Sequence, residues 1–146
     1  MEFTGAKAVF VDVDEISGNM LVSELRKKIS SKTKGVIPVH MAGFACEIDK
    51  IKKLCEENNL ILIEDCAHAI GTQFNDVHVG NYGITGCFSF YPTKQITTGE
   101  GGMVISNDKN IIENIKKLKA FGIDTPPELR KKPGVYDVQG LSLIHI

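Results

Sequence analysis

The sequence predicts an α/β fold with a mostly parallel sheet that is flanked by helices. Apolar, β-branched runs alternate along the first half of the chain with segments whose apolar residues recur at helical spacing. Such alternation is typical of parallel strands joined by crossover helices. The 146 residues correspond to about one domain, and the 42% of hydrophobic residues are enough to bury a core.

Three strands and two helices are predicted in the first half of the chain. The strands are runs rich in Val, Ile and Leu, and the helices place charged side chains opposite an apolar stripe. The pair Asn58-Asn59 favours the end of the second helix. In chain order we expect a strand over 6–13, a helix over 21–29, a strand over 35–39, a helix over 48–55 and a strand over 60–63.

Shorter elements are predicted after residue 70. Two short strands are expected within 71–80, joined by a turn at Asn75-Asp76. Asp108 is expected to cap a last helix that runs to residue 120. Between these elements we expect short strands over 87–91 and 103–106, and after them Pro126, Pro127 and Pro133 disfavour regular structure.

Charge and composition argue against several classes of function. Seventeen basic and eighteen acidic residues leave a net charge of -1, so no global field recruits nucleic acid or an anionic membrane. No apolar run reaches the roughly 20 residues that cross a bilayer, and no signal-peptide pattern opens the chain, so we expect a cytoplasmic protein. The cysteines lack CxxC spacing, which predicts free thiols in place of a zinc site or disulfides at Cys46, Cys55, Cys66 and Cys87.

Two residues that could take part in a reaction each follow a predicted strand. Asp65 comes just after the strand 60–63, and Lys94 comes just after the strand 87–91, in a loop rich in Gly and Thr. Ligands of open parallel sheets gather at the carboxyl ends of the strands. A partly desolvated lysine there can form a Schiff base, and pyridoxal phosphate needs such a lysine together with a carboxylate for its pyridine nitrogen. By spacing alone, a surface lysine and a loop-capping aspartate explain these residues equally well.

Two longer motifs resemble the DegT/DnrJ/StrS family of sugar aminotransferases. The first is Ile-Glu-Asp-Cys-Ala-His-Ala-Ile-Gly-Thr at 63–72, and the second is Gly-Cys-Phe-Ser-Phe-Tyr-Pro-Thr-Lys at 86–94, followed by Thr-Thr-Gly-Glu-Gly-Gly. The flanking segments 9–14 and 37–40 are also similar, and the resemblance extends from about residue 6 to residue 140. It implies the aspartate-aminotransferase-like large domain (fold type I) of pyridoxal-phosphate-dependent transferases.

The resemblance implies a role for each of four residues. Lys94 would carry the cofactor and then act as general base and acid, and Asp65 would pair with the protonated pyridine nitrogen. His68 stands where the family has Gln or His, near the cofactor ring. Ser89 would donate a hydrogen bond to the cofactor phosphate. The alternatives are a half-buried histidine with ordinary hydrogen bonds and a plain strand serine.

The implied reaction moves an amino group from an amino acid, with glutamate as the family expectation, to a keto group of a nucleotide-linked sugar. The resemblance also implies a homodimer with shared sites. Lys94 argues against the dehydrase branch, in which histidine replaces the lysine, and a nicotinamide-dependent enzyme would need a GxGxxG run that the sequence lacks. A catalytically inactive fragment or a regulatory relative is the alternative.

Both ends of the chain depart from the family pattern. Residues 1–140 are interpreted as a partial cofactor-binding large domain whose N-terminal part lies upstream, so we expect this piece alone to be inactive. Residues 141–146, Leu-Ser-Leu-Ile-His-Ile, resemble the translation of a sequencing-library adapter and are interpreted as a non-native tail. A short terminal strand is the alternative for these six residues.

Overall fold

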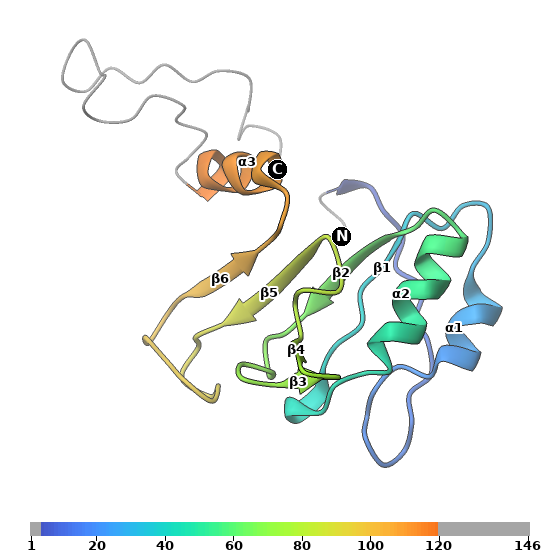
Figure 1. The fold of residues 1–146 in the computed structure, drawn as a ribbon, viewed down its shortest axis with the longest axis horizontal. Coiled ribbons are helices and arrows are strands. Elements are labelled where there is room, and N and C mark those ends of the chain that lie inside the picture. The colour runs from blue at the N-terminus through green and yellow to red at the C-terminus, as the bar shows by residue number, and fades with distance from the viewer. Residues whose placement is uncertain (1–3, 120–146) are drawn as a thin grey trace, which may run out of the picture. The chain divides into compact units, whose positions relative to one another are not determined.

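The computed structural model describes residues 4–119, in two compact units. Residues 8–107 form one unit, which holds the sheet and helices α1 and α2 (Figure 1). The other unit includes residues 4–7 and helix α3 (Lys109–Lys119), whose start is capped as expected, because the Asp108 carboxylate accepts a hydrogen bond from the backbone N–H of Asn110 at 2.8 Å. The predictions for residues 120–146 lie outside the described residues.

Four strands form a mostly parallel sheet in the order β1, β2, β5, β6. The first three run parallel, and β6 is antiparallel to β5. This confirms the predicted sheet, although β1 is shorter than expected and Val39 contacts Asp65 only through an isolated parallel bridge. The bounds are β1 Gly35–Val36, β2 Ile61–Asp65, β5 Thr85–Ser89 and β6 Gly102–Ile105.

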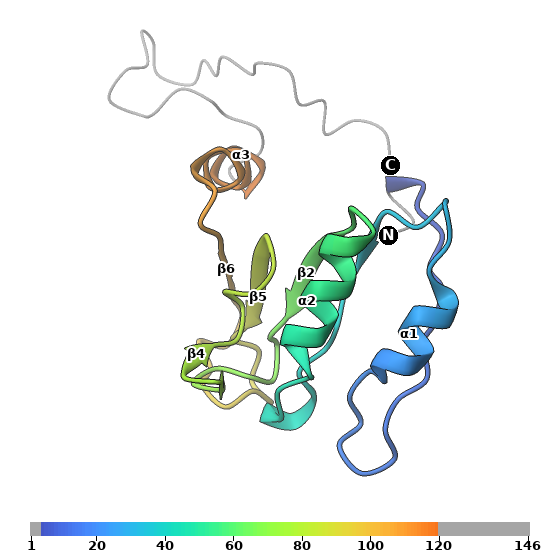
Figure 2. The same cartoon turned by 45° about the vertical axis from the view of Figure 1, so that its right-hand side comes forward.

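Helix α2 (Ile48–Glu57) supplies half of the buried cluster beside β1 and β2. Helix α1 (Val22–Lys28) packs against α2 (Figure 2). The apolar residues of α2 recur at helical spacing, so they form one stripe that faces the sheet. Burying each large aliphatic side chain stabilises the fold by about 1.5–3 kcal/mol. The buried cluster consists of Leu25, Val36, Cys46, Ile48, Ile51, Leu54, Cys55 and Leu62.

A short hairpin confirms the predicted strand pair after residue 70. Strands β3 (Gln73–Phe74) and β4 (Val77–His78) are antiparallel. The two turn residues, Asn75 and Asp76, have φ of 46° and 60°. Two positive φ angles are typical of the tight turn whose twist matches a two-residue hairpin, and Asn and Asp tolerate them better than most residues.

The strand predicted over 6–13 is wrong. Val9 and Phe10 are 62% and 87% exposed, and only Val13 pairs at all, through an isolated antiparallel bridge to Met20. A β-branched run forms a strand only when a neighbouring backbone accepts and donates its hydrogen bonds. No second strand lies beside this run among residues 4–119.

Within the same range, no helix is long and apolar enough to cross a membrane.

Candidate cofactor site

Asp65 lies at the carboxyl end of β2, where the chain is held on both sides. Its backbone N–H donates to the carbonyl of Pro38 at 2.9 Å, and its carbonyl accepts the N–H of His40 at 3.0 Å. The half-buried carboxylate accepts the N–H of Ala67 at 3.0 Å through Oδ1. That contact is the loop cap foreseen as the ordinary role, and it leaves Oδ2 without a hydrogen-bond partner among residues 4–119.

Lys94 lies in the loop that joins β5 to β6. The loop closes on Phe90, whose carbonyl accepts the N–H of Thr98 at 3.1 Å and the hydroxyl of Thr97 at 2.9 Å. The N–H of Lys94 donates to the carbonyl of Tyr91 at 3.0 Å, and the side chain of Lys94 is half-buried. The loop therefore holds the lysine next to the end of the sheet.

His68 and Lys94 line the same hollow of about 330 Å³, together with Ala42, Thr93 and Gln95. We call this cavity the Lys94 hollow. The Gln95 side-chain amide donates to the backbone carbonyl of His68 and ties the lysine loop to the histidine turn. The volume lies at the lower end of the range for small-molecule sites, which begins at about 300 Å³.

Ser89 ends β5 and lies on the same face of the sheet as Asp65. Asp65 is the register partner of Cys87, and side chains two residues apart on a strand share a face. The Ser89 hydroxyl accepts the N–H of Tyr91 at 3.3 Å. Neither Asp65 nor Ser89 lines the Lys94 hollow. Of the four predicted site residues, the structure brings His68 and Lys94 to one cavity, and Asp65 and Ser89 to neighbouring strand ends.

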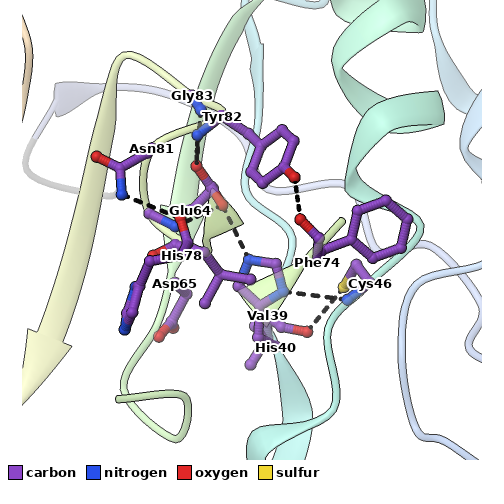
Figure 3. A network of polar contacts seen from close by, with 12 residues as sticks. Val39, His40, Cys46, Glu64, Asp65, Phe74, His78, Asn81, Tyr82 and Gly83 are labelled. Atoms are coloured by element: carbon purple, nitrogen blue, oxygen red, sulfur yellow. Dashed lines mark hydrogen bonds and ion pairs between the residues drawn. The ribbon is translucent and has the colours of Figure 1, made fainter. Parts of the chain in front are cut away.

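Glu64 leaves β2 on the face opposite Asp65 and is fully buried (Figure 3). Its Oε1 accepts the N–H groups of Tyr82 and Gly83, each at 2.7 Å. Its Oε2 accepts the N–H of Gly80 at 2.7 Å and the His40 Nε2 at 3.1 Å. Burial raises the pKa of this carboxyl, but the four donors outweigh that effect and leave the pKa below its ordinary value.

The sequence predicts no role for Glu64, His40 or Gln95. A signal for Glu64 was present, because an acid beside Asp65 in an alternating strand must face the core, where a charge needs partners. No local pattern names those partners, since His40 and the turn 80–83 are distant in sequence. Gln95 carries no signal apart from its place next to Lys94.

His40, Glu64 and Cys66 each offer one atom that could bind a metal, and these atoms lie within 4.8 Å of one another. All three residues are buried. The cluster does not fit a resident metal. Both ring nitrogens of His40 and both oxygens of Glu64 are already hydrogen-bonded. Burial raises the pKa of Cys66 to about 12, which disfavours the thiolate that metal ligation requires.

The sheet topology and the matching solved structures show the fold of a type I pyridoxal-phosphate-dependent transferase large domain. Residues 2–138 match the DegT/DnrJ/EryC1/StrS aminotransferase family, and the chain belongs to that family. The chain spans about a third of the length of the curated relatives that it matches.

Among these relatives are two GDP-perosamine synthases. The one from Escherichia coli O157:H7 is 42% identical over 123 residues, which are 84% of this chain and 34% of that protein. The one from Vibrio cholerae is 46% identical over 119 residues, or 82% of this chain and 32% of that protein. Among solved structures, Helicobacter pylori PseC, an aminotransferase of pseudoaminic acid biosynthesis, matches with a TM-score of 0.85 and 31% identity, covering 96% of this chain and 36% of its own.

Proposed function

We propose that this chain is the cofactor-binding part of an enzyme that moves an amino group from an amino acid to a keto group of a nucleotide-linked sugar. The observation that carries the proposal is the shared lining of the Lys94 hollow by His68 and Lys94, at the sheet edge that also bears Asp65. The GDP-perosamine synthases, and DesI, whose structure was solved with its TDP-sugar product, support the substrate class. In this proposal glutamate is the donor, and the enzyme is a cytoplasmic homodimer.

The residues at this edge suit the three functional groups of pyridoxal phosphate. The aldehyde needs an amine, which Lys94 offers from a half-buried position; the pyridine nitrogen needs an acid, which Asp65 offers; and the phosphate needs donors such as the Ser89 hydroxyl. Oδ2 of Asp65 accepts no bond within residues 4–119, so one carboxylate oxygen can take the proton-bearing nitrogen. When bound, the cofactor supplies an electron sink for the carbon next to the transferred nitrogen.

Two residues would carry the chemistry of this proposal. The Lys94 Nζ would hold the cofactor covalently and, once freed by the amino donor, would serve as the general base and acid that moves a proton from one carbon to another. The Asp65 carboxylate would keep the pyridine nitrogen protonated, because an ion pair favours the charged ring.

Two further residues would bind and orient the cofactor. His68 lies in the lining of the Lys94 hollow, where it would border the cofactor ring. Ser89 ends β5 and would donate a hydrogen bond from its hydroxyl to the phosphate. Both act by position, so their loss is expected to weaken binding more than it slows proton transfer.

The test is the visible absorption of the complete protein that carries this segment, purified with pyridoxal phosphate. We expect a cofactor band that glutamate bleaches and that Lys94→Ala eliminates. The control is Lys53→Ala, which removes an exposed lysine of α2 and should leave the band unchanged. A folded protein without the band would point to a cofactor-free relative, and a band that persists in Lys94→Ala would remove Lys94 from its role.

A further inference from the structure

Glu64 and His40 form a buried pair directly behind Asp65. Both side chains are inaccessible to solvent. Glu64 is the residue before Asp65 in β2, and the N–H of His40 donates to the carbonyl of Asp65 at 3.0 Å. Any shift of this pair therefore moves the peptide groups on both sides of Asp65.

The direction of every hydrogen bond in the pair is determined. His40 Nδ1 accepts the N–H of Cys46 at 3.1 Å, and a backbone N–H can only donate. The ring proton must then be on Nε2, which donates to Glu64 Oε2. Glu64 receives four donors in total, and only an ionised carboxylate accepts four. The network has no alternative arrangement with these side chains.

The pair also holds one wall of the Lys94 hollow. The segment 40–46 is anchored at its two ends by His40 and by the Cys46 N–H, and between them lies Ala42, which lines the hollow. Ala42 has a φ of 51°, a conformation that a non-glycine residue keeps only when its surroundings hold it. The next residue, Gly43, accepts the Thr72 hydroxyl at 2.9 Å, so the wall is joined to the turn that carries His68.

We infer that Glu64 and His40 are positioning residues for the cofactor: together they determine where the Asp65 carboxylate and the Ala42 wall meet the pyridine ring. This inference rests on the proposed function. It explains why a carboxylate that is costly to bury lies at this position. Glu64 cannot contact the cofactor itself, because it faces the opposite side of the sheet.

Two substitutions of His40 separate the two halves of the network. In His40→Gln, the amide nitrogen reaches the place of Nε2, so the bond to Glu64 is retained and the acceptor for the Cys46 N–H is lost. In His40→Asn, the amide reaches only the place of Nδ1, so the acceptor is retained and the bond to Glu64 is lost. Glu64→Gln removes acceptor capacity without changing the shape, because at least one of the four donors then faces an amide NH₂.

The experiment measures the dissociation constant of pyridoxal phosphate by titrating the apo form of the complete protein, alongside its Tm without cofactor. We expect the constant to rise about tenfold in Glu64→Gln and His40→Asn, the size of one lost hydrogen bond to a charged group, and less in His40→Gln. In the first two variants the pH profile of the cofactor band should also shift, because the ring nitrogen loses part of its contact with Asp65. Cys55→Ala, a core substitution on α2, should lower Tm with an unchanged constant and pH profile.

Each outcome decides between the two proposals. Variants that are folded, bind the cofactor as the wild type does and keep its pH profile would overturn the positioning role while leaving the proposed function intact. Failure of the wild type itself to bind pyridoxal phosphate would overturn the proposed function. If Glu64→Gln does not fold, the two His40 variants carry the comparison, since each keeps one of the two bonds.

Discussion

Gly86 of β5 lies so close to Gly80 that a Cβ on Gly86 would be 2.4 Å from the Gly80 Cα. This approach lays the turn 80–83 on the sheet beside β2. The turn then directs the N–H groups of Gly80, Tyr82 and Gly83 at Glu64. The absence of a side chain at Gly86 is thus what allows the buried carboxylate to find its donors.

The first prediction concerns this contact. Gly86→Ala should destabilise the protein by about 3–5 kcal/mol, because backbone rather than a flexible side chain blocks the new methyl group and the displaced turn also leaves Glu64 short of donors. Urea unfolding would measure the change. Gly71→Asn is the control, since Gly71 has open space around its Cβ position and asparagine tolerates its φ of 79°. Equal stability of Gly86→Ala and wild type would contradict the close approach.

A second prediction follows from the lowered pKa of Glu64. Because its pKa in the folded protein lies below the ordinary value of 4.5, the carboxylate contributes stability above that pH and loses it as the pH falls through the folded-state pKa. At neutral pH, Glu64→Gln should cost about 3 kcal/mol, since donors remain buried without an acceptor.

The difference in the free energy of unfolding between wild type and Glu64→Gln should become smaller as the pH is lowered below 4.5. Urea unfolding of both proteins over a pH series would follow it. Glu57→Gln, which alters an exposed glutamate at the end of α2, should show only a small difference throughout. If this difference between wild type and Glu64→Gln instead grew as the pH was lowered, the carboxyl would be protonated in the native state.

A third prediction concerns thiol reactivity. Burial raises the pKa of Cys46 to about 11 and of Cys66 to about 12, and it also raises the pKa of Cys55 and Cys87. The thiolate is the reactive form, so none of the four should react quickly with a thiol reagent near pH 8. Labelling followed by mass spectrometry should find the half-buried Cys87 modified first, and the other three only after unfolding. Fast labelling of Cys66 in the native protein would contradict this.

The fourth prediction tests the tie between the lysine loop and the histidine turn. Gln95→Ala removes the hydrogen bond to the His68 carbonyl and should weaken pyridoxal phosphate binding by about three- to tenfold, as expected for one neutral hydrogen bond. The control is Gln73→Ala, which alters an exposed glutamine of β3. The measurement is the same cofactor titration. Equal weakening by both variants would assign the effect to general destabilisation.

Local patterns were sufficient for most of the secondary structure. The apolar stripe of α2 and the Asn75-Asp76 turn each require only their own residues, because helical spacing and positive φ are properties of a short segment. Residues 6–13 show the limit of such patterns. Their composition favours a strand, but a strand also needs a partner, and the described chain places only Met20 opposite Val13.

The sequence by itself determined the class of fold, the family motifs and the identity of Lys94 and Asp65 as candidate cofactor residues. Tertiary structure alone decided which side chains support them. Glu64 accepts bonds from His40, 24 residues before it, and from a turn that follows it by 16–19 residues, and Gln95 meets a carbonyl 27 residues away. A buried charge must have partners, but which groups reach it depends on how the strands align, and that alignment is a property of the whole sheet.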